Sequence, residues 1–216
     1  MLSQEMEDFL ERELEESVAA GRPWRILANQ TILARVVQAN IDEPQFNALR
    51  PAIPESGSNL AEMLTTAGKL GLTGNMDAWD GYPAARSRLY DLAARSGSRD
   101  LLVITGDTHV FWQNQLFTDS GERMGVELGT SAVTSPRGYY QLGPDATTRM
   151  DELLAEQNDS VVWIDGRHRG YIRLALTPEH ARADYITVTD IESERYATNL
   201  LRSVRIERRD GTLYYV

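Results

Sequence analysis

The spacing of apolar residues predicts an amphipathic helix at the start of the chain. Five apolar side chains recur there at helical spacing: Met6, Phe9, Leu10, Leu14 and Val18. Ser3 is a predicted N-cap, acidic residues fill the first turn, and Gly21 ends the pattern. Residues 24–28, which are apolar except for Arg25, form a short run that is followed by two polar residues. That run predicts a strand after the helix, an order typical of α/β proteins.

Prolines and glycines dominate the pattern between residues 38 and 76. Pro44, Pro51 and Pro54 punctuate the first half of this stretch, and three glycines follow in its second half. These residues break regular elements, and long loops are more often functional or disordered than idle. We therefore expect a long excursion here, with one short helix near residues 60–67.

Helical and strand-like segments alternate through the remainder. Residues 79–83 predict a turn, and residues 84–94 and 145–157 have helical spacing. Strand-like segments are predicted at 101–104, 125–133, 160–164, 171–176, 183–188, 203–208 and 213–216. The first of them is apolar throughout, as expected of a strand buried on both faces. The last follows a hairpin turn signal at 209–212. The fold class is α/β, with a C-terminal third that is mainly antiparallel sheet.

Charge and composition limit the classes of function. Lys plus Arg total 22 and Asp plus Glu total 32, a formal net charge of -10. An acidic chain disfavours nonspecific binding to nucleic acid, and a phosphate substrate would need local positive charge from metal ions or arginines. The absence of cysteine excludes disulfides, zinc–thiolate sites and a cysteine nucleophile. No apolar run approaches the ~18 residues of a membrane-spanning helix, and the acidic N-terminus is not a signal peptide.

Asp107 and His109 are the candidate site residues with the clearest physical rationale. They follow the buried strand predicted at 101–104, and Gly106 allows a tight turn before them. Open α/β sheets bind ligands in loops beyond the carboxyl ends of their strands. A carboxylate oxygen and an imidazole nitrogen suit iron, manganese or zinc. We expect both side chains to approach each other around a solvent-accessible cavity. The alternative is that Asp107 caps a turn and His109 packs in the core.

Other histidines and hydroxyl residues give weaker signals. His168 lies in a basic turn and His180 in a second turn, so both are predicted to be exposed, although a phosphate-facing role stays open for His168. Ser131, Thr134 and Ser135 lack the glycine-flanked elbow of a serine nucleophile and are interpreted as turn and pocket-lining residues. A glycine-rich phosphate loop followed by lysine is also absent from the sequence.

A polar and aromatic cluster occupies the predicted turn near residue 80. It consists of Asp77, Trp79, Asp80 and Tyr82. Turn chemistry explains the Asp80-Gly81 pair, whereas two aromatic side chains in one turn equally suit the wall of a pocket. Trp79, Asp80 and Tyr82 are therefore candidate substrate-pocket residues.

Six motifs follow one another along nearly the whole chain. They are Leu2-Ser-x-x-Met6, Trp24-Arg-Ile-Leu-Ala-Asn-Gln30, Asp77-x-Trp-Asp-Gly-Tyr-Pro-Ala-x-Arg86, Thr105-Gly-Asp-x-His109, Thr130-Ser-Ala-Val-Thr-Ser-Pro136 and Arg169-Gly-Tyr171. Among them, Asp-Gly-Tyr-Pro-Ala and Gly-Asp-x-His in this order are the most specific. The series resembles the C-terminal part of the alkaline phosphatase D (PhoD) family, within the calcineurin-like metallophosphoesterases.

This resemblance implies both a fold and a chemistry. Residues 1–216 would be the C-terminal portion of a PhoD-like metallophosphatase domain, a β-sandwich flanked by helices. Such proteins hydrolyse phosphomonoesters or phosphodiesters at a multi-metal site, with iron and calcium as the implied cofactors, and are often exported. Asp107 and His109 would be catalytic metal ligands. Asn29 and Arg137 would be pocket contacts, against the alternatives of a strand-end hydrogen bond and a surface charge.

The resemblance also implies that the site is incomplete. Further metal ligands of the family lie in an upstream half with Asp-rich motifs, and this sequence contains no counterpart of that half. We therefore expect the isolated chain to be inactive, with the missing N-terminal half as its partner and a phosphate ester as the substrate. The alternative function is a non-catalytic truncated relative that acts as a binding or assembly module.

Overall fold

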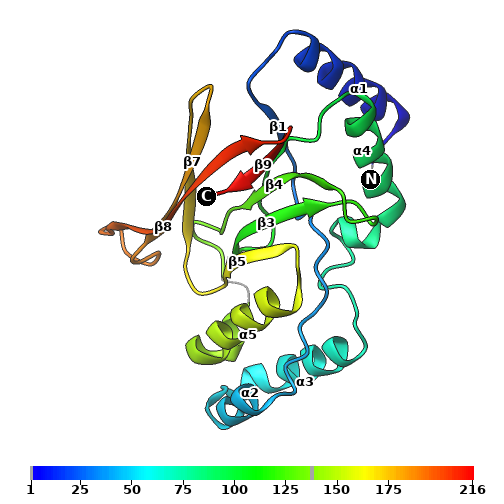
Figure 1. Ribbon diagram of the computed structural model, residues 1–216. Helices are drawn as coiled ribbons and strands as arrows, with labels where there is room; N and C mark the ends of the chain where they lie inside the picture. The colour runs from blue at the N-terminus through cyan, green and yellow to red at the C-terminus, as the bar shows by residue number, and fades with distance from the viewer. Residues whose placement is uncertain (1, 137–138) are drawn as a thin grey trace.

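The first helix forms where the apolar spacing predicts it. In the computed structural model, which describes residues 2–136 and 139–216, α1 spans Gln4–Ala19 (Figure 1). The Ser3 hydroxyl accepts a hydrogen bond from the backbone N–H of Met6, as expected of an N-cap. A four-residue strand, β1 (Arg25–Ala28), follows after a short connection.

The stretch between residues 38 and 76 is more helical than predicted. It contains α2 (Pro44–Leu49), a 3₁₀ turn (Arg50–Ala52) and α3 (Glu55–Lys69), so the expectation of one short helix was wrong in extent. The Glu43 carboxylate caps α2 by accepting from two backbone amides. Gly57 and Gly68 lie inside α3. A Cβ at either position would collide with the backbone of another segment, so only glycine fits there. These glycines serve close packing and do not end the helix.

Five strands form the first sheet, in the order β1-β2-β4-β3-β5. Its other members are β2 (Leu101–Thr105), β3 (Phe111–Phe117), β4 (Arg123–Gly129) and β5 (Val161–Asp165). β1 and β4 both run parallel to β2, whereas β3 is antiparallel to β4 and β5. The strand β3 was not predicted, because its polar residues Gln113 and Asn114 interrupt the apolar pattern. Both are buried beside polar partners from distant segments.

Four antiparallel strands form the second sheet. They are β6 (Gly170–Leu176), β7 (His180–Val188), β8 (Thr198–Arg209) and β9 (Thr212–Tyr215), paired in that order. The two sheets pack face to face, since Leu102 and Val126 of the first share one buried cluster with Tyr185 and Ile206 of the second. This confirms the predicted β-sandwich and the antiparallel C-terminal region.

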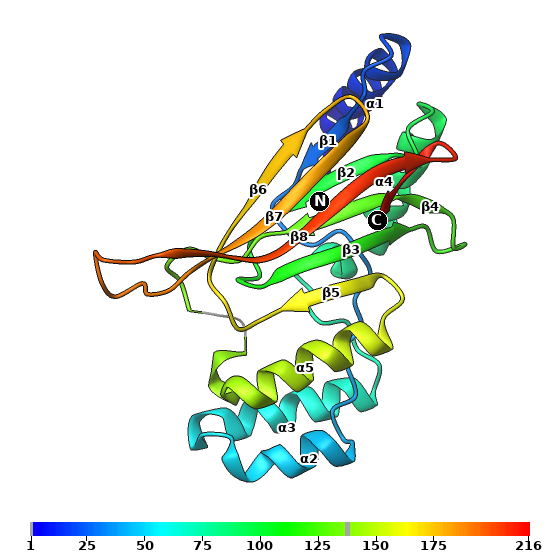
Figure 2. The same cartoon turned by 60° about the vertical axis from the view of Figure 1, so that its left-hand side comes forward.

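Helices cover the other face of the five-stranded sheet. The first group consists of α1 and α4 (Pro83–Arg95), which lie side by side. Ion pairs from Glu7 to Arg88 and from Glu11 to Arg95 join these two helices. The second group consists of α2, α3 and α5 (Pro144–Gln157), and α5 lies beside β5 (Figure 2). In the described part of the chain, no helix has the length and apolar character needed to cross a bilayer.

Candidate functional site

The loop between β2 and β3 carries an unusual backbone. Asp107 has φ of 68° and His109 has φ of 58°, both in the left-handed region. Only four described residues other than glycine have positive φ, and Tyr139 near this loop is a third. This conformation is uncommon for residues with a Cβ, although Asp and His tolerate it better than most. Such backbone strain persists where the surroundings impose it, and it is often found at functional sites.

A cavity of about 290 Å³ opens beside this loop. Its polar lining includes Asp107, Asp80, Gln38 and Asn75, and Tyr139 also borders it. Its apolar lining comes from several segments: Ile32, Val36, Ala78, Val110, Trp112 and Leu154. The cavity therefore brings together the loop after β2, the turn near residue 80 and the segment that follows β1.

His109 is held differently from Asp107. It is not among the residues that line the cavity, and its Nδ1 lies 2.9 Å from the carbonyl oxygen of Pro136. Because a carbonyl can only accept, the ring must donate through Nδ1–H. The Nε2 atom then carries the lone pair and is the nitrogen available to a metal ion or a proton.

Buried contacts fix this loop in place. The indole Nε1 of Trp112 donates to the hydroxyl of Thr108 over 2.9 Å. The buried hydroxyl of Ser131 lies 3.2 Å from the carbonyl oxygen of His109 and 2.8 Å from that of His168. The turn after β5 is thereby tied to the turn after β2. His168 itself is oriented by Asp165, whose carboxylate lies 2.9 Å from its Nδ1.

Asp80 is an anchor as well as a lining residue. Its carboxylate accepts from the backbone N–H of Val36 at 2.9 Å and pairs with the guanidinium of Arg86 at 2.5 Å. Both side chains of this ion pair are 6% exposed. Asp80 therefore holds the segment after β1 against the cavity while its charge is compensated by Arg86.

The other predicted pocket residues lie apart from this cavity. Asn29 and Trp79 line a larger groove beside β1, and the amide of Asn29 donates to the carbonyl of Thr31. Tyr82 is exposed and borders neither cavity nor groove. Arg137 lies outside the residues that the structure describes.

Sequence reasoning did not single out Glu127, which is completely buried in β4. Its carboxylate accepts from the backbone amides of Leu33 and Ala34 and from the side chain of Asn114. Burial raises its pKa to about 7, against the opposing effect of these three hydrogen bonds. Glu127 thus positions the segment that supplies Ile32 and Val36 to the cavity. The signal in the sequence was a single charged residue within the otherwise apolar stretch 124–129.

Asp151 is a second buried carboxylate, and it lies on α5, which also supplies Leu154 to the cavity. It accepts from the backbone N–H of Gly166 at 2.8 Å, and its other oxygen has no hydrogen-bond partner. Burial raises its pKa to about 7 from an ordinary value of 3.8. The folded state therefore retains a proton that the unfolded chain releases, so this carboxyl contributes stability at low pH that is lost as pH rises through 7.

We expect Asp151→Asn to remove this pH dependence. The free energy of unfolding of the unmodified chain should fall by about 2–4 kcal/mol through this group between about pH 4 and about pH 8. The variant, which has no proton to lose, should lack that component of the decline. Urea titrations across this range measure the effect, and superimposable profiles for both proteins would contradict it.

Metal-binding capacity follows from the donors present. Asp107 offers hard oxygen and His109 offers Nε2, which suit iron, and the carboxylate also suits calcium. Among the described residues, no group of three or more His, Asp or Glu side chains is arranged to hold a metal ion. The described chain on its own therefore does not fit a complete metal site.

The fold and the loop after β2 together define a β-sandwich flanked by helices, with a carboxylate and an imidazole just beyond the carboxyl end of an inner strand. The sequence model of the PhoD-like phosphatase family matches residues 1–185, and the chain belongs to this family, as the motifs predicted. It is 31% identical over 142 residues to alkaline phosphatase D of Bacillus subtilis (strain 168), a match that covers 64% of this chain and 23% of the relative.

A solved structure supports the same fold. The structure described as that of PhoD superposes with a TM-score of 0.69 at 21% sequence identity. The match covers 100% of this chain and 35% of the solved one. The chain thus spans about a third or less of the length of the relatives that it matches.

Proposed function

We propose that this chain forms part of a metal-dependent hydrolase of phosphomonoesters or phosphodiesters of the alkaline phosphatase D type. The observation that carries the proposal is the placement of Asp107 and His109, both in left-handed backbone at the carboxyl end of a parallel strand. Membership of the PhoD-like phosphatase family supports the same chemistry. The active form would contain additional polypeptide, because this chain spans only part of its relatives.

Asp107 and His109 are proposed as two ligands of that metal site, with iron and calcium as the ions. Such ions, when bound, supply positive charge to phosphoryl oxygens and acidity to an attacking water. The loop contacts of Thr108 and Ser131 would keep the carboxylate and Nε2 in fixed positions. The net charge of -10 makes such local positive charge necessary for a phosphate ester to bind.

A non-catalytic role is the second candidate. The described residues do not complete a metal site, and a large groove beside β1 is open to a partner. A chain with these properties would serve as a binding or assembly module. Metal content discriminates between the two candidates, since a functional site should copurify with metal in an intact assembly.

Metal binding by the isolated chain is expected to be weak. Two protein donors leave most coordination positions to water, so dissociation constants should be no lower than about 1 μM for iron, zinc or manganese. Titration calorimetry on residues 1–216 measures this value. Submicromolar binding that disappears in Asp107→Asn would mean that the chain completes its own site.

Hydrolysis tests the function directly. Residues 1–216 alone, with metals added, should show little or no turnover of an aryl phosphate or a bis-aryl phosphate. The same chain combined with the region of a PhoD-like relative that precedes the matched segment, here called the completed protein, should be active, because the missing metal ligands are then present. Robust activity of the chain alone would show that its site needs no further ligands, and an inactive completed protein with bound metal would favour the assembly module.

A further inference from the structure

A pocket of about 290 Å³ lies between α4 and the turn that joins β3 to β4, and we call it the α4 pocket. Its helical wall consists of Arg86 and Tyr90, four residues apart on one row of α4, and of Ser87 and Asp91 on the next row. The turn forms the opposite wall. Among described residues, its lining and that of the cavity beside Asp107 have no member in common. The α4 pocket is therefore separate from the proposed metal site.

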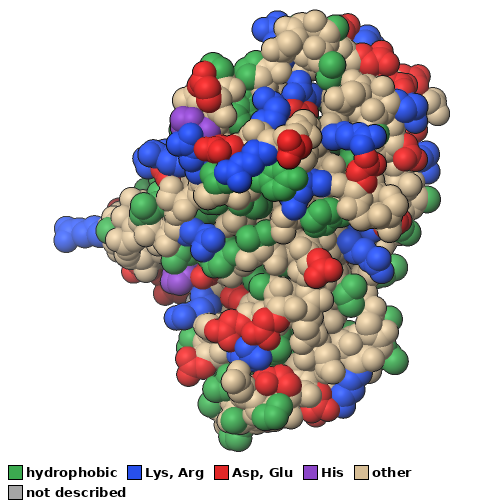
Figure 3. Space-filling model, in the orientation of Figure 1, with side chains coloured by type: hydrophobic (Ala, Val, Ile, Leu, Met, Phe, Trp, Pro, Cys, Tyr) green, Lys and Arg blue, Asp and Glu red, His purple; other side chains and the backbone are tan. Residues whose placement is uncertain are grey.

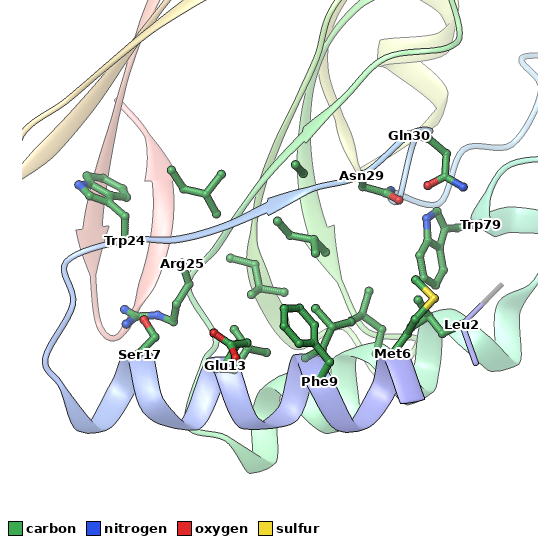
Figure 4. Close-up of a pocket in the computed structure, with 17 residues that line it drawn as sticks. Leu2, Met6, Phe9, Glu13, Ser17, Trp24, Arg25, Asn29, Gln30 and Trp79 are labelled. Carbon is green, nitrogen blue, oxygen red and sulfur yellow. The ribbon is translucent and has the colours of Figure 1, made fainter. Parts of the chain in front are cut away.

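Polarity distinguishes the α4 pocket from the larger groove beside β1. Figure 4 shows Met6 and Phe9 of α1 directed toward β1, with Trp24 at one end of that groove and Trp79 at the other. Such a lining offers mainly apolar contacts. Every described residue that lines the α4 pocket has instead a charged or hydroxyl-bearing side chain. Hydrogen bonds and charge therefore decide what this pocket binds.

Two buried donors form the floor of the pocket. Arg86 and Tyr90 are 5% and 3% exposed. The guanidinium of Arg86 binds Asp80 through Nη1, and the part of the chain that the structure describes offers no other partner to its remaining N–H groups. In that same part, the Tyr90 hydroxyl has no hydrogen-bond partner, and burial raises its pKa, so it keeps its proton. Because buried polar groups are normally paired, this floor is short of an acceptor.

Carboxylates form the rim of the pocket. Asp91, Asp119 and Glu122 are exposed lining residues, and Glu122 pairs with Arg99. Neither Asp91 nor Asp119 has an ion-pair partner within residues 2–136 and 139–216. An acidic rim attracts an ammonium group and repels a multiply charged anion such as phosphate.

The exposed arginines of α4 are already compensated by α1. Arg88 and Arg95 pair with glutamates of that helix, and acidic and basic side chains lie next to one another over the two helices at the upper right of Figure 3. Asp91 belongs to the pocket lining instead. Its charge is therefore available to a bound molecule.

We propose that the α4 pocket binds a small zwitterion of the amino-acid class, with its carboxylate at the buried floor and its ammonium group at the acidic rim. Arg86 and Tyr90 bind the carboxylate, since charge-assisted hydrogen bonds are about twice as strong as neutral ones. Asp91 and Asp119 hold the ammonium group. A metal ion does not fit, because the described residues contain no group of three or more side chains arranged to hold one. The volume suits a molecule below drug size, for which pockets span about 300–1,000 Å³.

One ion pair links this pocket to the cavity beside Asp107. Arg86 lines the pocket, whereas its partner Asp80 lines the cavity and accepts from the backbone N–H of Val36. A carboxylate bound to the free N–H groups of Arg86 changes the electrostatic environment of Asp80. Binding should therefore shift the NMR resonance of the Val36 amide, although Val36 does not line the pocket.

Titration of residues 1–216 with unbranched amino acids tests the proposal. The probes are β-alanine, 4-aminobutyrate and 6-aminohexanoate, which differ in the separation of their two charges. Calorimetry should give a Kd of about 1 mM or lower for at least one of them, an ordinary affinity for a molecule of this size. The alkylamine and the carboxylic acid of the same length should each bind about tenfold more weakly. Inorganic phosphate should not bind to the pocket.

Variants of the floor and the rim separate this site from a general charge effect. Tyr90→Phe removes the unpaired hydroxyl and should weaken binding about tenfold, while the urea midpoint stays the same or rises because no internal hydrogen bond is lost. Asp91→Asn should weaken binding about threefold. The control Asp210→Asn makes the same change of charge at an exposed position in the turn between β8 and β9, and should leave binding unchanged. Arg86 stays in place because it also holds Asp80.

Several results would overturn the proposal. They are the absence of binding by all three amino acids, equal binding of the alkylamine or the carboxylic acid, and displacement of the amino acid by phosphate. Binding that leaves the Val36 amide unshifted, or that Asp91→Asn and Asp210→Asn weaken equally, would do the same. None of these measurements requires hydrolysis or bound metal, so failure of the proposed function would leave the pocket assignment intact.

Discussion

Asp107→Asn and His109→Ala are each expected to lower kcat/KM for an aryl phosphate by about a hundredfold or more in the completed protein. Loss of groups that merely orient metal ligands already costs about ten- to a hundredfold, and loss of a ligand itself should cost more. Asparagine keeps the size of the side chain at position 107 and removes its charge. Steady-state kinetics and the metal content of each purified variant give the measurement.

Two surface substitutions provide matched controls for these variants. Asp210→Asn lies in the turn between β8 and β9, and His180→Ala lies at the start of β7, both away from the loop between β2 and β3. Each control should keep kcat/KM within about threefold of the unmodified protein, as is usual for surface positions. If Asp107→Asn and His109→Ala retained full activity and metal, the assignment of these two residues would be wrong.

Glu127→Ala should cause a large loss of stability for a single carboxylate substitution. It would leave the amides of Leu33 and Ala34 and the side chain of Asn114 without their acceptor in a buried region. Such groups cost about 1–3 kcal/mol each when unsatisfied, and relaxation and water entry reduce the sum, so we expect a loss of about 2–4 kcal/mol. Urea denaturation at about pH 6, below the raised pKa of Glu127, measures it.

The dependence of this loss on pH gives a second test. The carboxyl of Glu127 has a pKa of about 7 in the folded state and an ordinary value of 4.5, so its stabilising contribution declines as pH rises through 7. The difference between the unmodified chain and Glu127→Ala should therefore shrink toward about pH 8. Glu62→Ala, on the exposed face of α3, should change stability by no more than about 0.5 kcal/mol at either pH. A Glu127→Ala loss as small as this would contradict the anchoring role.

Elements with local signals could be predicted from the sequence. α1 has an apolar period and a capping serine within one segment, and β2 has a continuous apolar run ended by glycine. The position of Asp107 just beyond the carboxyl end of a strand could be predicted from β2 alone. Such features depend on neighbours in sequence, which the pattern contains.

Elements that depend on distant contacts could not be predicted. Strand β3 buries Gln113 because Arg202 of β8 donates to it, and α3 contains Gly57 because Gln141 packs against it. The cavity beside Asp107 could not be predicted from the sequence for the same reason. Asp80 was a candidate from turn composition, but its contact with Val36 and the lining by Tyr139 join segments far apart in the chain.

The left-handed backbone at Asp107 and His109 affects which substitutions evolution would accept at these two positions. Glycine adopts such φ values freely, whereas a side chain there costs about 1 kcal/mol or more. Selection for stability alone would therefore hold neither Asp nor His at these positions, since glycine is common in turns of this kind. Without selection for the proposed metal site, these two positions should be among the first to change, and laboratory evolution for thermal tolerance without an activity screen should favour replacements there.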